Sequence, residues 1–142
     1  MSSIDQAEVA PARAGVRTRE LALHGAIIAA VALGYIVVRI AIAPETGPLR
    51  WHATDLFGGI ALPSLFTLLF SAHGELGHWA RTLGGKLALT AAAVVVWEVV
   101  MPILNDRSVA DVLDVVAYFV GTLLQHAFVS LVGKSRAKPS CE

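Results

Sequence analysis

The chain has 142 residues, of which 56% are apolar and 15% are charged, whereas about a quarter of the residues in an average soluble domain are charged. The net charge is zero and no basic patch is interleaved with aromatic residues, so nucleic acid is not an expected partner. The single cysteine, Cys141, excludes an internal disulfide and a cysteine-based zinc site, and the composition as a whole favours a protein of the lipid bilayer.

Four long apolar runs follow a polar N-terminal stretch. They cover about residues 21–43, 53–72, 85–104 and 109–132. Each has the roughly 20 residues that a helix rising about 1.5 Å per residue needs to cross about 30 Å of hydrocarbon. The first run exceeds the about 7–15 apolar residues of a secretory signal, so we expect a retained helix. The sequence predicts an all-α protein with one transmembrane domain, residues 21–133, in which four helices form a bundle with short loops.

Prolines mark where these helices end or bend. Pro44 and Pro48 follow the first run, where a residue without an amide proton ends a helix naturally. Pro63 lies inside the second run and Pro102 near the end of the third. We therefore expect a kink at Pro63 and a helix terminus near Pro102.

The basic residues predict the orientation of the bundle. If both chain ends are cytoplasmic, the inner side carries Arg13, Arg17, Arg19, Arg81, Lys86, Lys134, Arg136 and Lys138. The outer loops then carry only Arg50 and Arg107, which agrees with the positive-inside rule. We expect a multi-pass protein of a bacterial cytoplasmic (inner) membrane, with residues 1–20 and 134–142 as cytoplasmic tails.

Polar residues near the outer helix ends form the candidate site. A charge at the centre of a spanning helix costs about 2.5–3.5 kcal/mol, so such residues usually face protein or water. On the fourth helix Asp111, Asp114, Tyr118 and Gln125 lie on one stripe, which Gly121 continues. On the first helix Tyr35 and Arg39 are four residues apart and share a side. The predicted outward-facing cluster comprises Arg39, Asp55, Glu98, Arg107, Asp111, Asp114 and Tyr118.

Three interpretations of this cluster are open. Arg39 and Arg107 pair with the acids to set the helix register, or the cluster forms a pocket for a polar headgroup or small amphiphile. In the third interpretation, Glu98 acts with Asp111 or Asp114 in acid/base catalysis, for which paired carboxylates are necessary but not diagnostic.

The segment His73-Gly74-Glu75-Leu76-Gly77-His78 superficially resembles a zinc-protease motif. In the motif H-E-x-x-H the two histidines are four residues apart on one helix face, whereas here they are five apart and the Glu is displaced. Two glycines also weaken helix formation. We interpret the segment as a solvated inner loop and predict no metal site and no cofactor.

The end of the third helix and the start of the fourth resemble a known family. The residues are Glu98-Val99-Val100-Met101-Pro102, then Asp106-Arg107-Ser108, then Asp114 to Gly121. They are similar to the signature of the VanZ-like membrane proteins, in which a Glu, an Arg-containing loop and an Asp-x-x-x-Asn-x-x-Gly helix start follow one another. By position Glu98, Arg107, Asp114 and Gly121 correspond to the family's characteristic residues. Met101 stands where the family has Gln, Tyr118 where it has Asn, and Gln125 where it has Gly.

The resemblance implies a role in the cell envelope, because the family is named for a protein associated with glycopeptide resistance. We expect a non-enzymatic membrane protein that binds or shields a lipid-linked envelope precursor or a glycopeptide. Besides the lipid bilayer, a second copy of the chain or another membrane protein is a possible partner. The alternatives are a membrane enzyme that acts on a lipid or its headgroup, and an accessory subunit of a membrane complex.

Overall fold

The computed structural model describes the backbone of residues 3–42, 48–104 and 111–136, and the side chains of residues 18–40, 52–104 and 111–135. Every regular element within these ranges is helical. In chain order they are α1 (Ser3–Val37), the π-helical turn η1 (Val38–Ile42), α2 (Pro48–Phe70), α3 (Gly74–Arg81), α4 (Leu83–Val95), the π-helical turn η2 (Val96–Val100), α5 (Met101–Leu104) and α6 (Val112–Arg136). The predicted all-α fold is confirmed.

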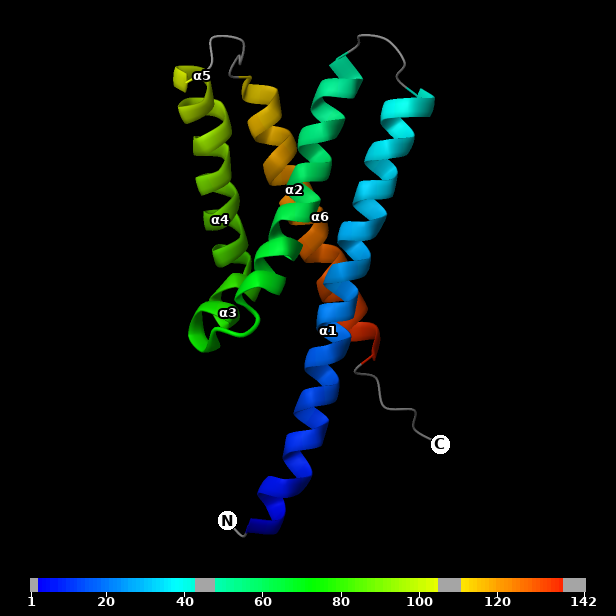
Figure 1. Ribbon diagram of the computed structural model, residues 1–142, viewed down its shortest axis with the longest axis vertical. Helices are drawn as coiled ribbons and strands as arrows, with labels where there is room; N and C mark the ends of the chain where they lie inside the picture. The colour runs from blue at the N-terminus through cyan, green and yellow to red at the C-terminus, as the bar shows by residue number, and fades with distance from the viewer. Residues whose placement is uncertain (1–2, 43–47, 105–110, 137–142) are drawn as a thin grey trace.

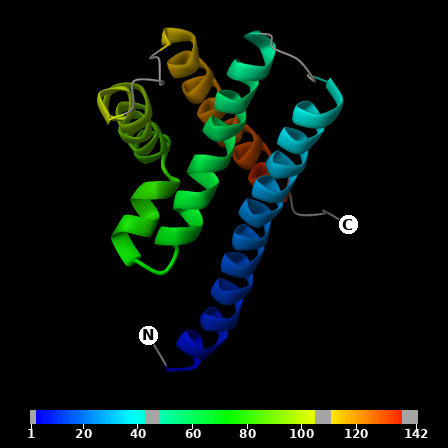
Figure 2. The ribbon, with the colours of Figure 1, turned by 45° about the horizontal axis from the view of Figure 1, so that its top comes forward.

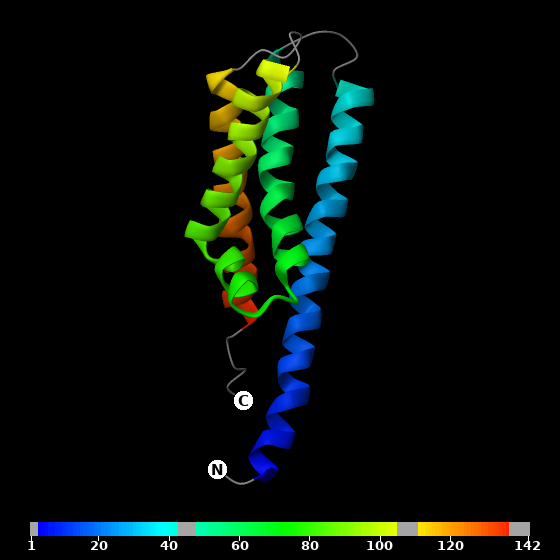
Figure 3. The same cartoon turned by 60° about the vertical axis from the view of Figure 1, so that its left-hand side comes forward.

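In the described part of the chain, four helical segments are long and apolar enough to cross a membrane. They are Thr18–Ile40, His52–Phe70, Leu83–Leu104 and Val112–Ser135. The four segments lie side by side, and α1 extends beyond the others toward the N-terminus (Figure 3). Successive segments alternate in direction, so that α1 begins and α6 ends at the same end of the bundle (Figure 1). The chain is therefore a multi-pass membrane protein.

We call the end of the bundle where α2 and α6 begin the upper end, and the end that carries α3 the lower end (Figure 1). Burial within the bundle is inverted relative to a water-soluble protein. The buried polar side chains are those of His24, Ser64, Thr67, Lys86, Thr90, Thr122 and Gln125. Large apolar side chains such as Leu33, Ile40 and Ile103 are exposed. Because lipid tails are as apolar as leucine, small and polar residues hold such helices together.

Glycines bring α2 and α6 into close contact. A Cβ atom at Gly59 would lie 2.2 Å from the Tyr118 carbonyl oxygen, and one at Gly121 would lie 2.5 Å from the Leu56 carbonyl oxygen. No larger residue fits at either position without separating the helices. Small residues that allow such an approach are typical of helix interfaces in membranes.

Pro63 provides a polar contact at the same crossing. The helix α2 continues through Pro63, which has no amide proton to donate to the carbonyl of Gly59, four residues earlier. The Thr122 hydroxyl on α6 lies 3.2 Å from the Gly59 oxygen and 3.1 Å from the Tyr118 oxygen of its own helix, so the two carbonyls share its proton, and it lies 2.8 Å from the Thr90 hydroxyl on α4. Thr122 therefore links three of the spanning helices.

The segment predicted to be an inner loop contains a helix. The helix α3 lies beside the lower end of α2 (Figure 2), where the absence of a side chain at Gly77 lets the backbones meet: a Cβ there would lie 2.4 Å from the Phe70 oxygen. Ala80 is fully buried, and the Arg81 Nε atom lies 2.7 Å from a Glu20 oxygen of α1. These contacts outweigh the low helix propensity of glycine, and the expectation of an irregular loop was wrong.

The helix α4 begins at Leu83, two residues before the predicted start. The Thr82 side chain caps it by accepting a hydrogen bond from the Gly85 amide, 3.0 Å away. Lys86 lies in the first turn of this helix and is only 2% exposed. The sequence analysis counted it among the bases of the cytoplasmic side; its side chain lies in the bundle interior.

Candidate functional site

Five of the predicted site residues come together at the upper end of the bundle, from α2, η2 and the start of α6. His52, which the sequence analysis did not select, lies among them. We call the group the upper polar cluster: His52, Asp55, Glu98, Asp111, Asp114 and Tyr118. The residues from α2 and α6 are held together by the glycine crossing below them.

His52 and Asp114 are in direct contact, with 2.7 Å between His52 Nδ1 and Asp114 Oδ1. Both side chains are partly exposed. Because Nδ1 faces the carboxylate, Nε2 is the ring nitrogen left for another group. The sequence analysis missed His52 because it precedes the predicted start of the second helix by one residue, and because a count of formal charges treats histidine as neutral. Its spacing of three from Asp55, on one side of α2, is the signal that could have identified it.

Asp55 and Tyr118 form the deeper part of the cluster. The Asp55 carboxyl group interacts with the Tyr118 hydroxyl and also with the Asp114 carboxyl group. Tyr118 is buried against α2, where Gly58 leaves room for its ring. Neighbouring carboxylates repel each other when both are charged, so a positively charged group bound at the cluster would relieve the repulsion.

Glu98 and Asp111 connect the cluster to backbone groups. The Asp111 amide donates to Glu98 Oε2 at 3.0 Å, and Asp111 Oδ1 accepts from the Leu113 amide at 2.8 Å. Asp111 thereby caps the first turn of α6. Glu98 lies in η2, where the Met101 amide bonds to the Val96 carbonyl, five residues earlier. This π-helical turn directly precedes Pro102, whose missing amide proton would leave the Glu98 carbonyl unpaired in a regular α-helix.

The cluster contains the donor atoms of a possible cation site. His52, Asp111 and Asp114 each offer one ligand atom, and these atoms lie within 4.8 Å of one another. Imidazole nitrogen and carboxylate oxygen are ligands for zinc and other divalent ions, and the same carboxylates accept hydrogen bonds from protonated amines. The arrangement is therefore suited to a positively charged group.

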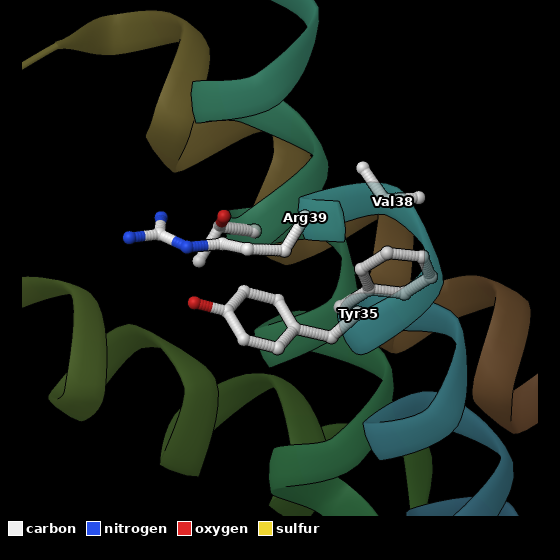
Figure 4. Close-up of a pocket in the computed structure, with 5 residues that line it drawn as sticks. Tyr35, Val38 and Arg39 are labelled. Atoms are coloured by element: carbon white, nitrogen blue, oxygen red, sulfur yellow. The ribbon is translucent and has the colours of Figure 1, made fainter. Parts of the chain in front are cut away.

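Of the two predicted arginines, the structure describes Arg39, which lies outside the upper polar cluster. Arg39 lies in η1, directly after α1, and lines a hollow between this helix and α2 (Figure 4). The expected ion pair between Arg39 and a carboxylate is not present among the residues whose side chains are described. Arg107 lies outside the described residues.

A second polar group, which we call the interior network, lies below the cluster and takes one side chain from each spanning helix. Lys86 Nζ donates to Gln125 Oε1 at 2.9 Å, and Gln125 Nε2 donates to Ser64 Oγ at 2.9 Å. Ser64 Oγ lies 3.1 Å from His24 Nδ1, and the four side chains are at most 2% exposed. Gln125 was predicted to face the bundle, whereas its partners carry no recognisable spacing in the sequence. The network fixes the relative positions of the four helices.

Comparison of the chain with protein-family models, with curated proteins and with solved structures found no match. The likeness to VanZ-like proteins is therefore carried by the short motif alone. Two of its positions, Glu98 and Asp114, lie in the upper polar cluster, and a third, Gly121, lies at the α2–α6 crossing.

Proposed function

We propose that this chain is a non-enzymatic protein of a bacterial cytoplasmic membrane that binds or shields an envelope component at the upper polar cluster. The observation that carries the proposal is the convergence of His52, Glu98 and Asp114, from segments far apart in sequence, at one end of a membrane bundle. Charged groups that only held the helices together would not need to be partly exposed at the end of the bundle.

The chemistry of the cluster favours ligands with amino and hydroxyl groups. Its carboxyl groups accept hydrogen bonds from both, and hydrogen bonds to charged groups are roughly twice as strong as neutral ones. Glycopeptides and lipid-linked precursors with sugar or peptide headgroups carry such donors. The VanZ-like motif supports the same class of ligand.

The proposed orientation places the cluster on the outer face. Arg19, Arg81 and Lys134 all lie toward the lower end of the bundle, and the positive-inside rule assigns that end to the cytoplasm. A ligand outside the cell would then reach the upper end directly.

Glycopeptide binding in a Gram-positive host tests the proposal. If the cluster shields the precursor to which the glycopeptide attaches, cells expressing the wild type should bind less fluorescent glycopeptide at their surface, and tolerate more, than cells with an empty vector. If the cluster binds the glycopeptide itself, these cells should bind more of it. Asp114→Asn and Glu98→Gln should return both values to those of the empty vector. Glu75→Gln is the matched control, because this exposed acid lies on α3 at the opposite end. The wild type and the variants are compared at equal levels in the membrane. Equal glycopeptide binding by cells with the wild type and cells with the empty vector would refute the proposal.

The His52–Asp114 contact supports a second candidate, an enzyme acting on a lipid headgroup. A carboxylate that holds Nδ1 of a histidine orients the ring so that Nε2 can act as a base. Purified wild type should then turn over a lipid substrate, and Glu98→Gln or His52→Ala should abolish turnover. Inertness of the wild type across a broad lipid panel would count against this candidate.

A further inference from the structure

The hollow between α1 and α2 is separate from the upper polar cluster. It is shallow and open at the surface, and it is lined by Tyr35, Val38, Arg39, Thr54 and Phe57. Thr54 is next to Asp55 in sequence, but the two residues take part in different sites. The hollow thus lies on the α1 side of α2, and the cluster lies on the α6 side.

Two polar side chains, one from α1 and one from η1, point the same way at this hollow. Tyr35 and Arg39 are one helical turn apart, and Figure 4 shows the Tyr35 hydroxyl and the Arg39 guanidinium extending in the same direction. The Phe57 ring packs beside Gly34 of α1, where a Cβ would lie 3.4 Å from the ring. The Phe57 ring and Val38 supply apolar walls beside the polar groups.

The position of Arg39 along α1 determines what surrounds it. Arg39 is one residue from the end of the candidate span Thr18–Ile40, the depth at which lipid tails give way to headgroups. The neighbouring Ile36 and Ile40 are 49% and 73% exposed, so this side of α1 faces lipid. Within the described side chains, Arg39 makes no ion pair. A guanidinium at this depth lies at the level of the lipid phosphates, and its paired donors match the oxygens of a phosphate.

We propose that the α1–α2 hollow binds the phosphate group of an anionic phospholipid. Arg39 donates to two phosphate oxygens, the Tyr35 hydroxyl donates to a third polar atom of the headgroup, and the acyl chains lie along the exposed apolar face of α1 that includes Leu33 and Ile36. This inference does not depend on the proposed function, because it concerns a different face of α2.

Titration of the delipidated, purified full chain with defined lipids, followed by native mass spectrometry, tests the inference. We expect phosphatidylglycerol to bind about tenfold more tightly than phosphatidylcholine, whose fixed choline cation opposes Arg39. Arg39→Gln should remove this preference, Arg39→Lys should keep part of it, and Tyr35→Phe should weaken phosphatidylglycerol binding about threefold. Arg19→Gln is the control, because it removes an exposed arginine at the other end of the span.

Three outcomes would overturn the inference. They are equal binding of both lipids by the wild type, an unchanged preference in a folded Arg39→Gln protein, and displacement of phosphatidylglycerol by inorganic phosphate at the same concentration. Circular dichroism establishes whether each variant is folded, and Arg39→Lys keeps the test decisive if Arg39→Gln is not. The lipid titration contains only purified protein and lipid. A negative result in it therefore does not bear on the proposed function, which the glycopeptide experiment in cells tests separately.

Discussion

Replacing Gly59 with alanine tests the packing that holds the candidate site in place. The new Cβ would lie 2.2 Å from the Tyr118 carbonyl oxygen and 2.8 Å from the Tyr118 Cα. Because non-bonded heavy atoms are most stable at about 3.5–4.0 Å, α2 and α6 must separate by about 1 Å locally. Overpacking of this kind costs about 1–3 kcal/mol.

The separation also affects the hydrogen bond between the Thr122 hydroxyl and the Gly59 carbonyl, which is already 3.2 Å long. Loss of such an interhelical bond adds about 0.6 kcal/mol, while the better helix propensity of alanine returns up to about 1 kcal/mol. We therefore expect Gly59→Ala to lower the free energy of unfolding by about 2 kcal/mol.

Unfolding by sodium dodecyl sulfate in mixed micelles, followed by circular dichroism, measures this change. Gly25→Ala is the control, because its new Cβ would have no neighbour within 4 Å. It should leave the free energy of unfolding unchanged or raise it by up to about 1 kcal/mol. If the two variants were equally stable, the close α2–α6 contact would be refuted.

Three further predictions concern the interior and the orientation. Gln125→Leu should lower the free energy of unfolding by about 3 kcal/mol, because it leaves the buried Lys86 ammonium without its acceptor. The double variant with Lys86→Met should recover most of this loss in the same assay. Additive losses from the two substitutions would contradict the interior network. Thr122→Val should cost about 1 kcal/mol of unfolding free energy in the wild type but less in a Pro63→Ala background, where the restored amide of residue 63 donates to the Gly59 carbonyl. An equal cost in both backgrounds would refute the role of the Thr122 hydroxyl as a donor to Gly59. A membrane-impermeant maleimide should label Cys141 in broken but not in intact cells, and labelling of intact cells would reverse the proposed orientation.

The parts of the site that the sequence predicts are those that depend on helical spacing alone. Asp111, Asp114, Tyr118 and Gln125 recur at intervals of three, four and seven, and any straight helix places them on one side. Asp55 and Glu98 were identified because their helices end at the same depth. These acids come from α2, η2 and α6. They meet because the alternating direction of the helices brings these helix ends to the same end of the bundle.

The parts that it did not predict depend on how the helices rotate and where they begin. Arg39 was grouped with the acids by depth, but the rotation of α1 directs it to a hollow on the other side of α2. The helix of Lys86 begins at Leu83 instead of Gly85, and the Lys86 side chain, which was counted among the bases of the cytoplasmic side, donates to Gln125 inside the bundle.

The sequence by itself determined the lipid environment, the all-α fold and the approximate spans, because hydrocarbon thickness and backbone hydrogen bonding allow few other ways to place such apolar runs. Only the tertiary structure decided which polar groups are neighbours. Helices in lipid gain little from burying one apolar face rather than another, so contacts such as that of Gly59 with Tyr118, and of Lys86 with Gln125, select the rotation of each helix. Those contacts join residues that are tens of positions apart, and no local spacing encodes them.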